Sequence, residues 1–430
     1  MELRNKRRAG AVGLAVLALV ATGCRGGDSG GEAGGVDAPG VTSEPCPEAV
    51  NEDNGCIYLG TISDLTQGPF APLGVPITEA QEAFWARVNE EGGIGGYDID
   101  VTEYVRDNLY NPETHAQVYN EIEPDVLALA QTLGSPTTLA ILSQMENNDV
   151  VGAPASWTSL WGFEDNILES GASYCVEGMN VVDYFVENEG IASVMAVGYP
   201  GDFGGDAAAG AEIAAGERNI DFTNVETAPG QEAQAGAISQ IVRENPDLVL
   251  LSVGPTETAV IVGQAAAQGY TGQFVGTAPT WNPALLQSPA APALEQLFVH
   301  SGPWGSFSSD TDGHAAMREA IGEVDQPNDG YTSGWAWSYP LKAALEEWLE
   351  GDYDKTRAGL VEAIGNLETV DFEGMLPEEA GDRTGENDIF KQTVLSDVDP
   401  EAAAGLTIRE DFFTGPTAEA YEFEGACFEG

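Results

Sequence analysis

Basic residues are scarce in this chain of 430 residues. Lysine and arginine together number 16, against 70 aspartates and glutamates, and the formal net charge is −54 at pH 7. Nucleic acid and anionic lipid surfaces would be repelled by such a chain, so we exclude them as partners. We also take adaptation of the surface to high salt as a hypothesis.

Histidine and the motifs of common catalytic sites are scarce too. The three histidines, His115, His300 and His314, are scattered, and the cysteines lack short CxxC spacing, so no metal site is expected. Walker and His-Glu-x-x-His motifs are absent, and the glycine-rich stretch 201–205 departs from the dinucleotide pattern. We predict no cofactor, no catalytic residues and no enzyme. A hydrolase with a carboxylate pair stays open, because acidic pairs are too common here to single one out.

Long apolar runs occur only at the N-terminus. Basic residues within 4–8 precede an apolar or small-residue run at 9–21, which is too short for a bilayer span and is typical of a signal peptide over 1–23. The small residues before Cys24 resemble a bacterial lipobox, although Ala21 stands where a branched residue is usual. Cys24 is therefore the predicted lipidation site, with ordinary cleavage nearby as the alternative.

The segment 24–44 is rich in Gly, Ser, Ala, Asp, Glu and Pro, and it predicts a flexible tether. A coil of this length holds a folded part about 25 Å from its anchor. We expect an exported protein attached by lipid alone to the outer face of the cytoplasmic membrane.

Four further cysteines, an even number in an exported chain, predict two disulfides. Cys46 and Cys56 are ten residues apart across a polar turn and form the favoured pair. Cys175 and Cys427 would then form the second, although three pairings are possible.

The rest of the chain alternates strand-like and helix-like segments, which predicts an α/β fold with parallel sheets. Since almost 390 residues exceed what one core serves, we expect two doubly wound lobes. Helix starts are predicted at a Thr78 and Gln81 capping box, at Asn111 and at Ser135. The predicted strands lie at 57–62, 99–105, 126–130, 150–153, 193–197, 222–227, 248–253 and 274–276.

One motif is more specific than this alternation of strands and helices. The segment 89–96, Asn-Glu-Glu-Gly-Gly-Ile-Gly-Gly, resembles the Asn-x-x-Gly-Gly-Ile-x-Gly signature of the leucine/isoleucine/valine-binding family of type I periplasmic binding proteins. It follows a Gly-Pro loop at 67–69 and precedes 107–116, which is similar to the family's Asp-x-x-x-x-Pro-x-x-Ala element. Weaker matches extend the resemblance over about 57–398.

The resemblance implies two lobes joined by a three-crossing hinge, with a ligand cleft between them. The first lobe is expected at 45–172 and 298–370, and the second at 173–297 and 371–430. Closure of the lobes would bury a small ligand.

The resemblance also implies ligand-binding loops. Ser135 and Thr137 at a helix N-terminus suit a carboxylate, although helix capping is the simpler interpretation. Ala155, Ser156 and Trp157 match the segment that holds the amino-acid head group in the family, but Trp157 replaces a smaller polar residue.

Further candidates come from other loops. Phe203 stands where relatives carry an aromatic residue, and Phe70 and Leu73 would line an apolar side. Thr256 and Glu257 begin a helix, where Glu257 could accept an ammonium group. Trp281 ends a loop in which amino-acid binders often place an acidic residue that this chain lacks.

These observations together favour an extracytoplasmic solute-binding protein of an ABC importer, which takes a small amino-acid-like or related polar solute. Its expected partners are that ligand and the permease subunits. A lipoprotein sensor that reports a ligand to a membrane partner is the alternative, because both roles use one cleft.

Overall fold

A computed structural model describes residue 36, residues 38–384 and residues 389–428. The predicted signal peptide, Cys24 and most of the predicted tether lie outside the described residues. The chain from Val36 onward is one compact unit. None of its described helices is both long and apolar enough to cross a membrane.

The first sheet has β2, Gly55–Ser63, at its centre. Two strands pair with β2 in parallel, namely β3, Tyr97–Asp107, and β4, Ala128–Leu133. β5, Gly152–Ala155, pairs with β4 in parallel, whereas the short β1, Val41–Thr42, pairs with β2 antiparallel. Every residue of β4 and β5 is buried, as expected for parallel strands covered on both faces.

The second sheet has seven strands in the order β12-β11-β10-β9-β8-β6-β7. The five strands from β6 to β10 run parallel, and β11 and β12 join one edge antiparallel. Their bounds are β6 Ser193–Gly198, β7 Asp221–Glu226, β8 Leu248–Ser252, β9 Gln273–Gly276, β10 Phe298–Gly302, β11 Thr393–Val398 and β12 Leu406–Phe413. The predicted fold class is confirmed, with antiparallel strands added to two mostly parallel sheets.

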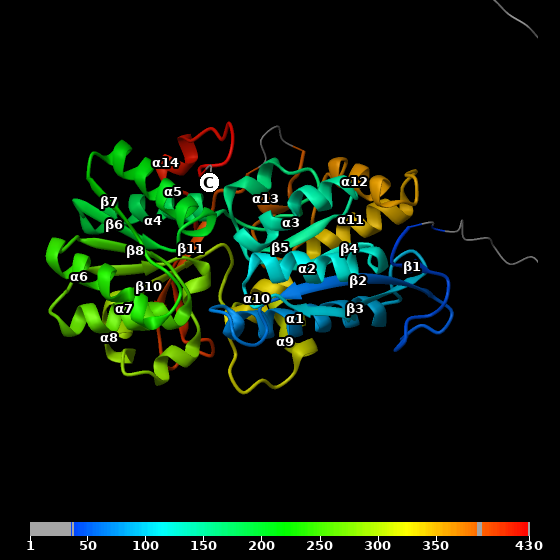
Figure 1. Ribbon diagram of the computed structural model, residues 1–430, viewed down its shortest axis with the longest axis horizontal. Coiled ribbons are helices and arrows are strands. Elements are labelled where there is room, and N and C mark those ends of the chain that lie inside the picture. Colours follow the sequence, from blue (N-terminus) through cyan, green and yellow to red (C-terminus); the bar gives the residue numbers. More distant parts are fainter. Residues whose placement is uncertain (1–35, 37, 385–388, 429–430) are drawn as a thin grey trace, which may run out of the picture. The chain divides into compact units, whose positions relative to one another are not determined.

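Helices cover both faces of each sheet (Figure 1). Around the first sheet lie α1 Ala71–Glu90, α2 Pro112–Ile122, α3 Ser135–Asn147, α9 Asp312–Ile321, α10 Asp329–Ala336, α11 Ser338–Glu350, α12 Arg357–Gly365 and α13 Glu378–Gly381. Around the second lie α4 Tyr174–Glu189, α5 Asp202–Arg218, α6 Ala235–Glu244, α7 Pro255–Ala267, α8 Ala291–Leu297 and α14 Pro416–Ala420.

The first helix starts earlier than the sequence predicts. The predicted cap at Thr78 is wrong, because α1 already begins at Ala71 and the Thr78 hydroxyl donates to the Gly74 carbonyl inside the helix. Pro76 has no N–H for the Pro72 carbonyl one turn before it. The side-chain amide of Asn282, from a loop after β9, donates to this carbonyl at 3.1 Å. A contact distant in sequence therefore supports a proline-containing first turn.

The Asn-x-x-Gly-Gly-Ile-x-Gly motif turns the chain from α1 into β3. The Asn89 side chain accepts from the Ile99 N–H and donates to the Ile99 carbonyl, both at 2.8 Å. Gly93 has φ +73°, and a Cβ there would lie 2.1 Å from the Tyr97 carbonyl oxygen. The motif thus has a structural role away from the ligand-binding loops.

The chain crosses between the two sheets' layers more than once. β5 ends the parallel run of the first sheet, and α4 packs beside α5 near the second sheet. β10 pairs in parallel with β9, so residues 298–302 belong to the second sheet. We propose that the return to the first lobe starts after Gly302, and the remaining lobe boundaries stay a prediction.

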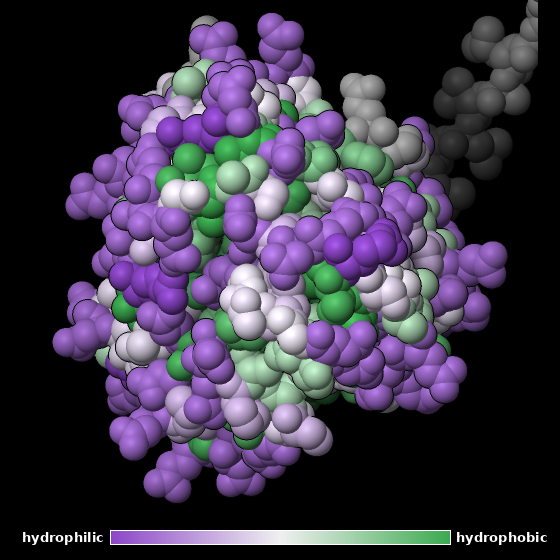
Figure 2. Space-filling model, turned by 90° about the vertical axis from the view of Figure 1, so that its left-hand side faces the viewer, coloured by the Kyte–Doolittle hydropathy of each residue, from purple (hydrophilic) through white to green (hydrophobic). Residues whose placement is uncertain are grey.

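The surface agrees with the acidic composition. Figure 2 shows hydrophilic side chains over most of one face, with apolar residues in small separate areas. Charged side chains spread in this way favour solubility. Adaptation to high salt stays a hypothesis.

Candidate ligand-binding site

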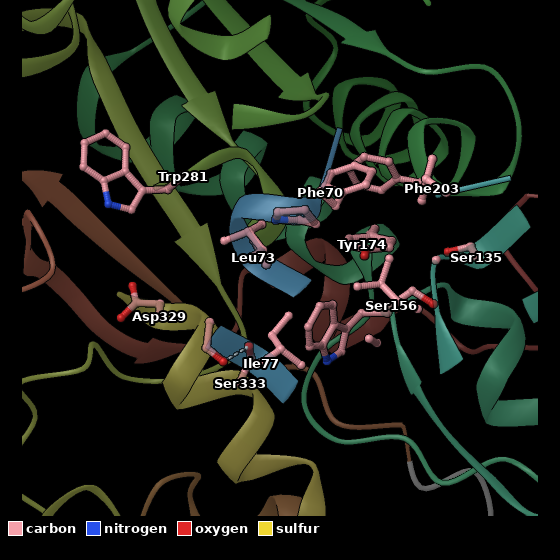
Figure 3. A pocket seen from close by; sticks show the side chains of 18 of the residues that line it. Phe70, Leu73, Ile77, Ser135, Ser156, Tyr174, Phe203, Trp281, Asp329 and Ser333 are labelled. Carbon is pink, nitrogen blue, oxygen red and sulfur yellow. Dashed lines mark hydrogen bonds between the residues drawn. The ribbon is translucent and has the colours of Figure 1, made fainter. Parts of the chain in front are cut away.

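A cavity lies where loops from both sheets meet. The space between its lining residues comes to about 600 Å³, part of which is open solvent at the mouth. Figure 3 places Ser135 and Phe203 on one side and Trp281 and Asp329 on the other, with Leu73 and Tyr174 between them. Ligands of α/β proteins bind where loops lead from strands into helices, as they do here.

The walls of the cavity are mainly apolar. Aromatic rings follow one another along it, from Tyr110 to Phe70 at 4.7 Å, to Phe203 at 6.0 Å and to Tyr174 at 4.7 Å. The row continues from Tyr174 to Trp157 at 6.1 Å. Such a wall favours a ligand with a large apolar part. The other apolar lining residues are Leu73, Ile77, Leu133, Ala155, Ala278, Pro279, Trp281 and Trp304.

Ser135 supplies a polar group at one side of the cavity. It is the first residue of α3, and the preceding Gly134 takes the N-cap position with φ +97°. The prediction that Ser135 caps the helix is therefore wrong. Its hydroxyl oxygen is buried and has no hydrogen-bond partner within the described residues. Beside the positive end of a helix dipole, this hydroxyl can donate to an anionic head group.

Glycine is needed at position 134, directly before Ser135, for the chain to adopt this helix start. A Cβ at this position would come within 2.6 Å of both the Tyr110 ring and the Thr137 hydroxyl. Backbone with φ near +97° also disfavours any side chain. The Tyr110 ring therefore packs directly over the Gly134 backbone, next to Ser135.

Eight of the eleven predicted ligand-binding residues line the cavity. They are Phe70, Leu73, Ser135, Ala155, Ser156, Trp157, Phe203 and Trp281. Ser156 is a second hydroxyl at the cavity, and its oxygen accepts from the Trp161 indole at 3.2 Å. Ligand contact by these residues is a proposal, since the cavity shows only where they lie.

The other three candidates lie away from the cavity. The Thr137 hydroxyl donates to the carbonyls of Leu133 and Gly134, which turns it toward its own backbone. Thr256 is exposed on α7. The buried Glu257 carboxylate accepts from the Gly230 N–H at 2.7 Å. Neither Thr256 nor Glu257 is among the residues that line the described cavity.

The sequence analysis missed several polar lining residues. The His300 imidazole donates through Nε2 to the Ala278 carbonyl at 3.1 Å, and burial lowers the pKa of His300 to about 4. Asp329 accepts from the Phe307 N–H at 2.8 Å, and burial raises the pKa of Asp329 to about 6. Ser333 lines the cavity one turn later. Only tertiary contacts bring these residues together, although Asn328-Asp329 does signal a helix start.

No lysine or arginine is among the described residues that line the cavity. An anionic head group would have to be held by hydroxyls and helix N–H groups alone. Among the described lining residues, Asp329 carries the one carboxylate that an ammonium group could contact.

The structure contains both expected disulfides. Cys46 pairs with Cys56, and Cys175 pairs with Cys427. Cys175 follows the cavity residue Tyr174, so the second disulfide joins the C-terminal segment to the cavity wall.

The buried carboxylate of Asp206 lies beside this second disulfide. It accepts from the backbone N–H groups of Ser159 at 2.9 Å and Cys175 at 3.0 Å, and from the Ser159 hydroxyl. The Cys427 N–H donates to the Ser159 hydroxyl at 2.8 Å. Asp206 and the Cys175–Cys427 disulfide thus hold together the segments that contain Ser159, Cys175 and Cys427. A metal ion between these cysteines is not expected, because both sulfurs are in the disulfide.

Several solved structures share this fold. A fatty acid ABC transporter substrate-binding protein from Thermomonospora curvata is 28% identical, with a TM-score of 0.80 over 89% of this chain and 96% of that chain. A branched-chain amino acid ABC transporter protein from Thermus thermophilus with bound valine is 17% identical, with a TM-score of 0.72 over 85% and 98%. A leucine-binding protein from Thermotoga maritima is 17% identical, with a TM-score of 0.69 over 83% and 99%.

Two sequence comparisons were informative in different ways. Among curated proteins, none matches this chain. The family model described as periplasmic binding protein matches residues 57–399. With a match over most of its length, this chain belongs to the periplasmic binding protein family, as an ABC transporter substrate-binding protein rather than an enzyme.

Proposed function

We propose that this protein captures a small carboxylate with a mainly apolar tail, of the fatty-acid class, and delivers it to ABC permease subunits. The aromatic cavity, with an unpartnered Ser135 hydroxyl at a helix N-terminus, carries the proposal. The 28% identical relative is named for fatty acid, which supports the same class.

The head group and the tail have separate places in this proposal. Ser135 and Ser156 supply hydroxyls for the carboxylate, and the helix dipole of α3 favours its negative charge. Phe70, Trp157 and Tyr174 offer apolar surface for the tail. Each buried methylene then contributes about 0.8 kcal/mol to binding.

An amino acid is the second candidate ligand. Asp329 favours it, because a carboxylate at the cavity could accept an ammonium group. The loop from Ala278 to Trp281 argues against it, because it presents apolar groups where amino-acid binders often have an acid. We therefore rank an amino acid below a fatty acid.

Calorimetric titration with straight-chain carboxylates tests the ligand class. From butanoate through hexanoate and octanoate to decanoate, we expect affinity to rise about fourfold per methylene until the cavity is filled. Ser135→Ala should weaken all of them by roughly tenfold to a hundredfold, since hydrogen bonds to charged groups contribute about 1.5 to 3 kcal/mol. Ser143→Ala, at an exposed position of the same helix, is the matched control.

A pair of ligands separates the two candidates. Leucine and 4-methylpentanoate share a carbon skeleton and a carboxylate, and they differ in the amino group. The proposal requires 4-methylpentanoate to bind more tightly. Tighter binding of leucine would contradict it and favour the amino-acid ligand.

The pH dependence of binding gives a further prediction. Asp329 has a pKa of about 6, so it is neutral below that pH and negatively charged above it. A carboxylate ligand, which is already almost fully ionised at the lower limit, should bind a few-fold more weakly as pH rises from about 5.5 to about 7.5, because like charges then share the cavity. Titrations across this range should show the decrease in the wild type and not in Asp329→Asn. Stronger binding at the higher pH would instead indicate a cationic ligand group.

We also propose export and attachment through a lipid on Cys24. The support is the N-terminal sequence and membership of the periplasmic binding protein family. A sensor role would use the same cavity. Genes for permeases and ATPases beside this one would favour transport, and a neighbouring kinase gene would favour sensing.

A further inference from the structure

Two tryptophans, Trp157 and Trp304, line the cavity and lie in segments that connect the sheets. Trp157 lies in the segment between β5 and α4, and Trp304 lies in the segment between β10 and α9. Their ring centroids are 4.7 Å apart, with planes tilted by 53°. Both indoles also line the cavity. The two connecting segments therefore meet through side chains that a ligand would touch.

Trp157 lies near the start of its segment and is hydrogen-bonded to two residues near the end of that segment. Its indole N–H donates to the Ser170 carbonyl at 2.7 Å, and its carbonyl accepts from the Tyr174 N–H at 2.7 Å. The side chain also packs on Trp337, 5.4 Å away between ring centroids. A rotation of the Trp157 indole would therefore break a bond that holds the segment together.

The backbone of the first segment also lies close to the Pro303 side chain of the second. Gly171 has φ +88°, and a Cβ at this position would lie 2.6 Å from Cβ of Pro303. Glycine is required both for this backbone conformation and for the close approach. A change in the angle between the segments would thus disturb both this contact and the tryptophan pair.

We infer that Trp157 couples occupancy of the cavity to the arrangement of the two connecting segments. A ligand shifts a conformational equilibrium only through contacts that differ between the states. A tail packed against Trp157 makes such contacts while the Trp157 and Trp304 indoles lie in their observed tilted contact. Trp157 is then a positioning residue for closure, in addition to forming part of the wall.

The inference rests on the proposed function, because it takes decanoate as the ligand. Small-angle scattering of the full protein should show compaction at saturating decanoate in the wild type. Trp157→Ala should bind about tenfold to a hundredfold more weakly. Even when saturated, it should compact less than the wild type. Trp157→Phe, which keeps a ring but loses the N–H to Ser170, should lie between the two.

Leu73→Ala is the matched control, because Leu73 lines the cavity from α1. It should weaken binding and still compact fully at saturation. Full compaction of both saturated Trp157 variants would overturn the coupling and leave the proposed function standing. Absence of decanoate binding by the wild type would instead contradict the proposed function. If Trp157→Ala does not fold, Trp157→Phe and Trp304→Phe decide the question by the same measurement.

Discussion

Replacing Cys175 and Cys427 with serine is expected to lower the free energy of unfolding by about 5 kcal/mol. The disulfide joins residues 252 positions apart, and closing so long a loop removes much entropy from the unfolded chain. The same model gives about 3 kcal/mol for Cys46 and Cys56, which are ten positions apart.

Guanidinium denaturation of the two double-serine variants and the wild type measures both costs. The test depends mainly on which variant loses more stability. Each variant loses one disulfide, so a difference between them reflects the length of the loop that the disulfide closes. An equal cost for both variants would contradict the loop-length argument. Decanoate affinity should fall only in the Cys175 and Cys427 variant, because Cys175 follows Tyr174 in the cavity wall.

Replacing Asp206 with alanine is expected to cost about 3 to 5 kcal/mol of stability. The carboxylate accepts from the Ser159 and Cys175 N–H groups and from the Ser159 hydroxyl, all in a buried setting. Alanine would leave these donors without their acceptor. Asp206→Asn should cost less than alanine, because its side-chain oxygen can still accept from the Ser159 and Cys175 N–H groups while its N–H₂ group donates to the Ser159 hydroxyl, which can also accept.

Thermal unfolding of these variants beside Glu212→Gln tests the prediction. Glu212 is exposed on the same helix, and its substitution should change stability by less than about 0.5 kcal/mol. Since Asp206 and the second disulfide hold the same segments, their costs should not add when combined. Fully additive costs would show that the two act independently.

Local chemistry predicted much of the fold. The Asn111 cap is confirmed, because its side chain accepts from the Thr114 N–H at 2.9 Å within its own turn. The predicted strands match those observed, apart from shifts at the ends. The start of α1 could not be predicted, because the Pro72 carbonyl, for which Pro76 has no N–H, accepts from Asn282, 210 positions away.

The site was predicted less completely, for a related reason. The resemblance identified loops such as those of Ser135, Trp157 and Phe203, and all three line the cavity. It could not show that Thr137 bonds its own backbone or that Glu257 bonds Gly230. Tyr174, His300, Trp304 and Asp329 come from segments whose meeting depends on the whole tertiary fold.

The pairing of β10 with β11 has a consequence for the order of assembly during synthesis. Val299 pairs with Asp397, and the five helices from α9 to α13 lie between them in the sequence. Until Asp397 has been synthesised, β10 presents an open edge of unpaired N–H and C=O groups, which is a site for wrong pairing with other chains. A chain that folds from its N-terminus as it emerges can complete the first sheet well before the second. Slow arrival of the segment beyond Gly302, during synthesis or during export, would therefore prolong a state prone to aggregation.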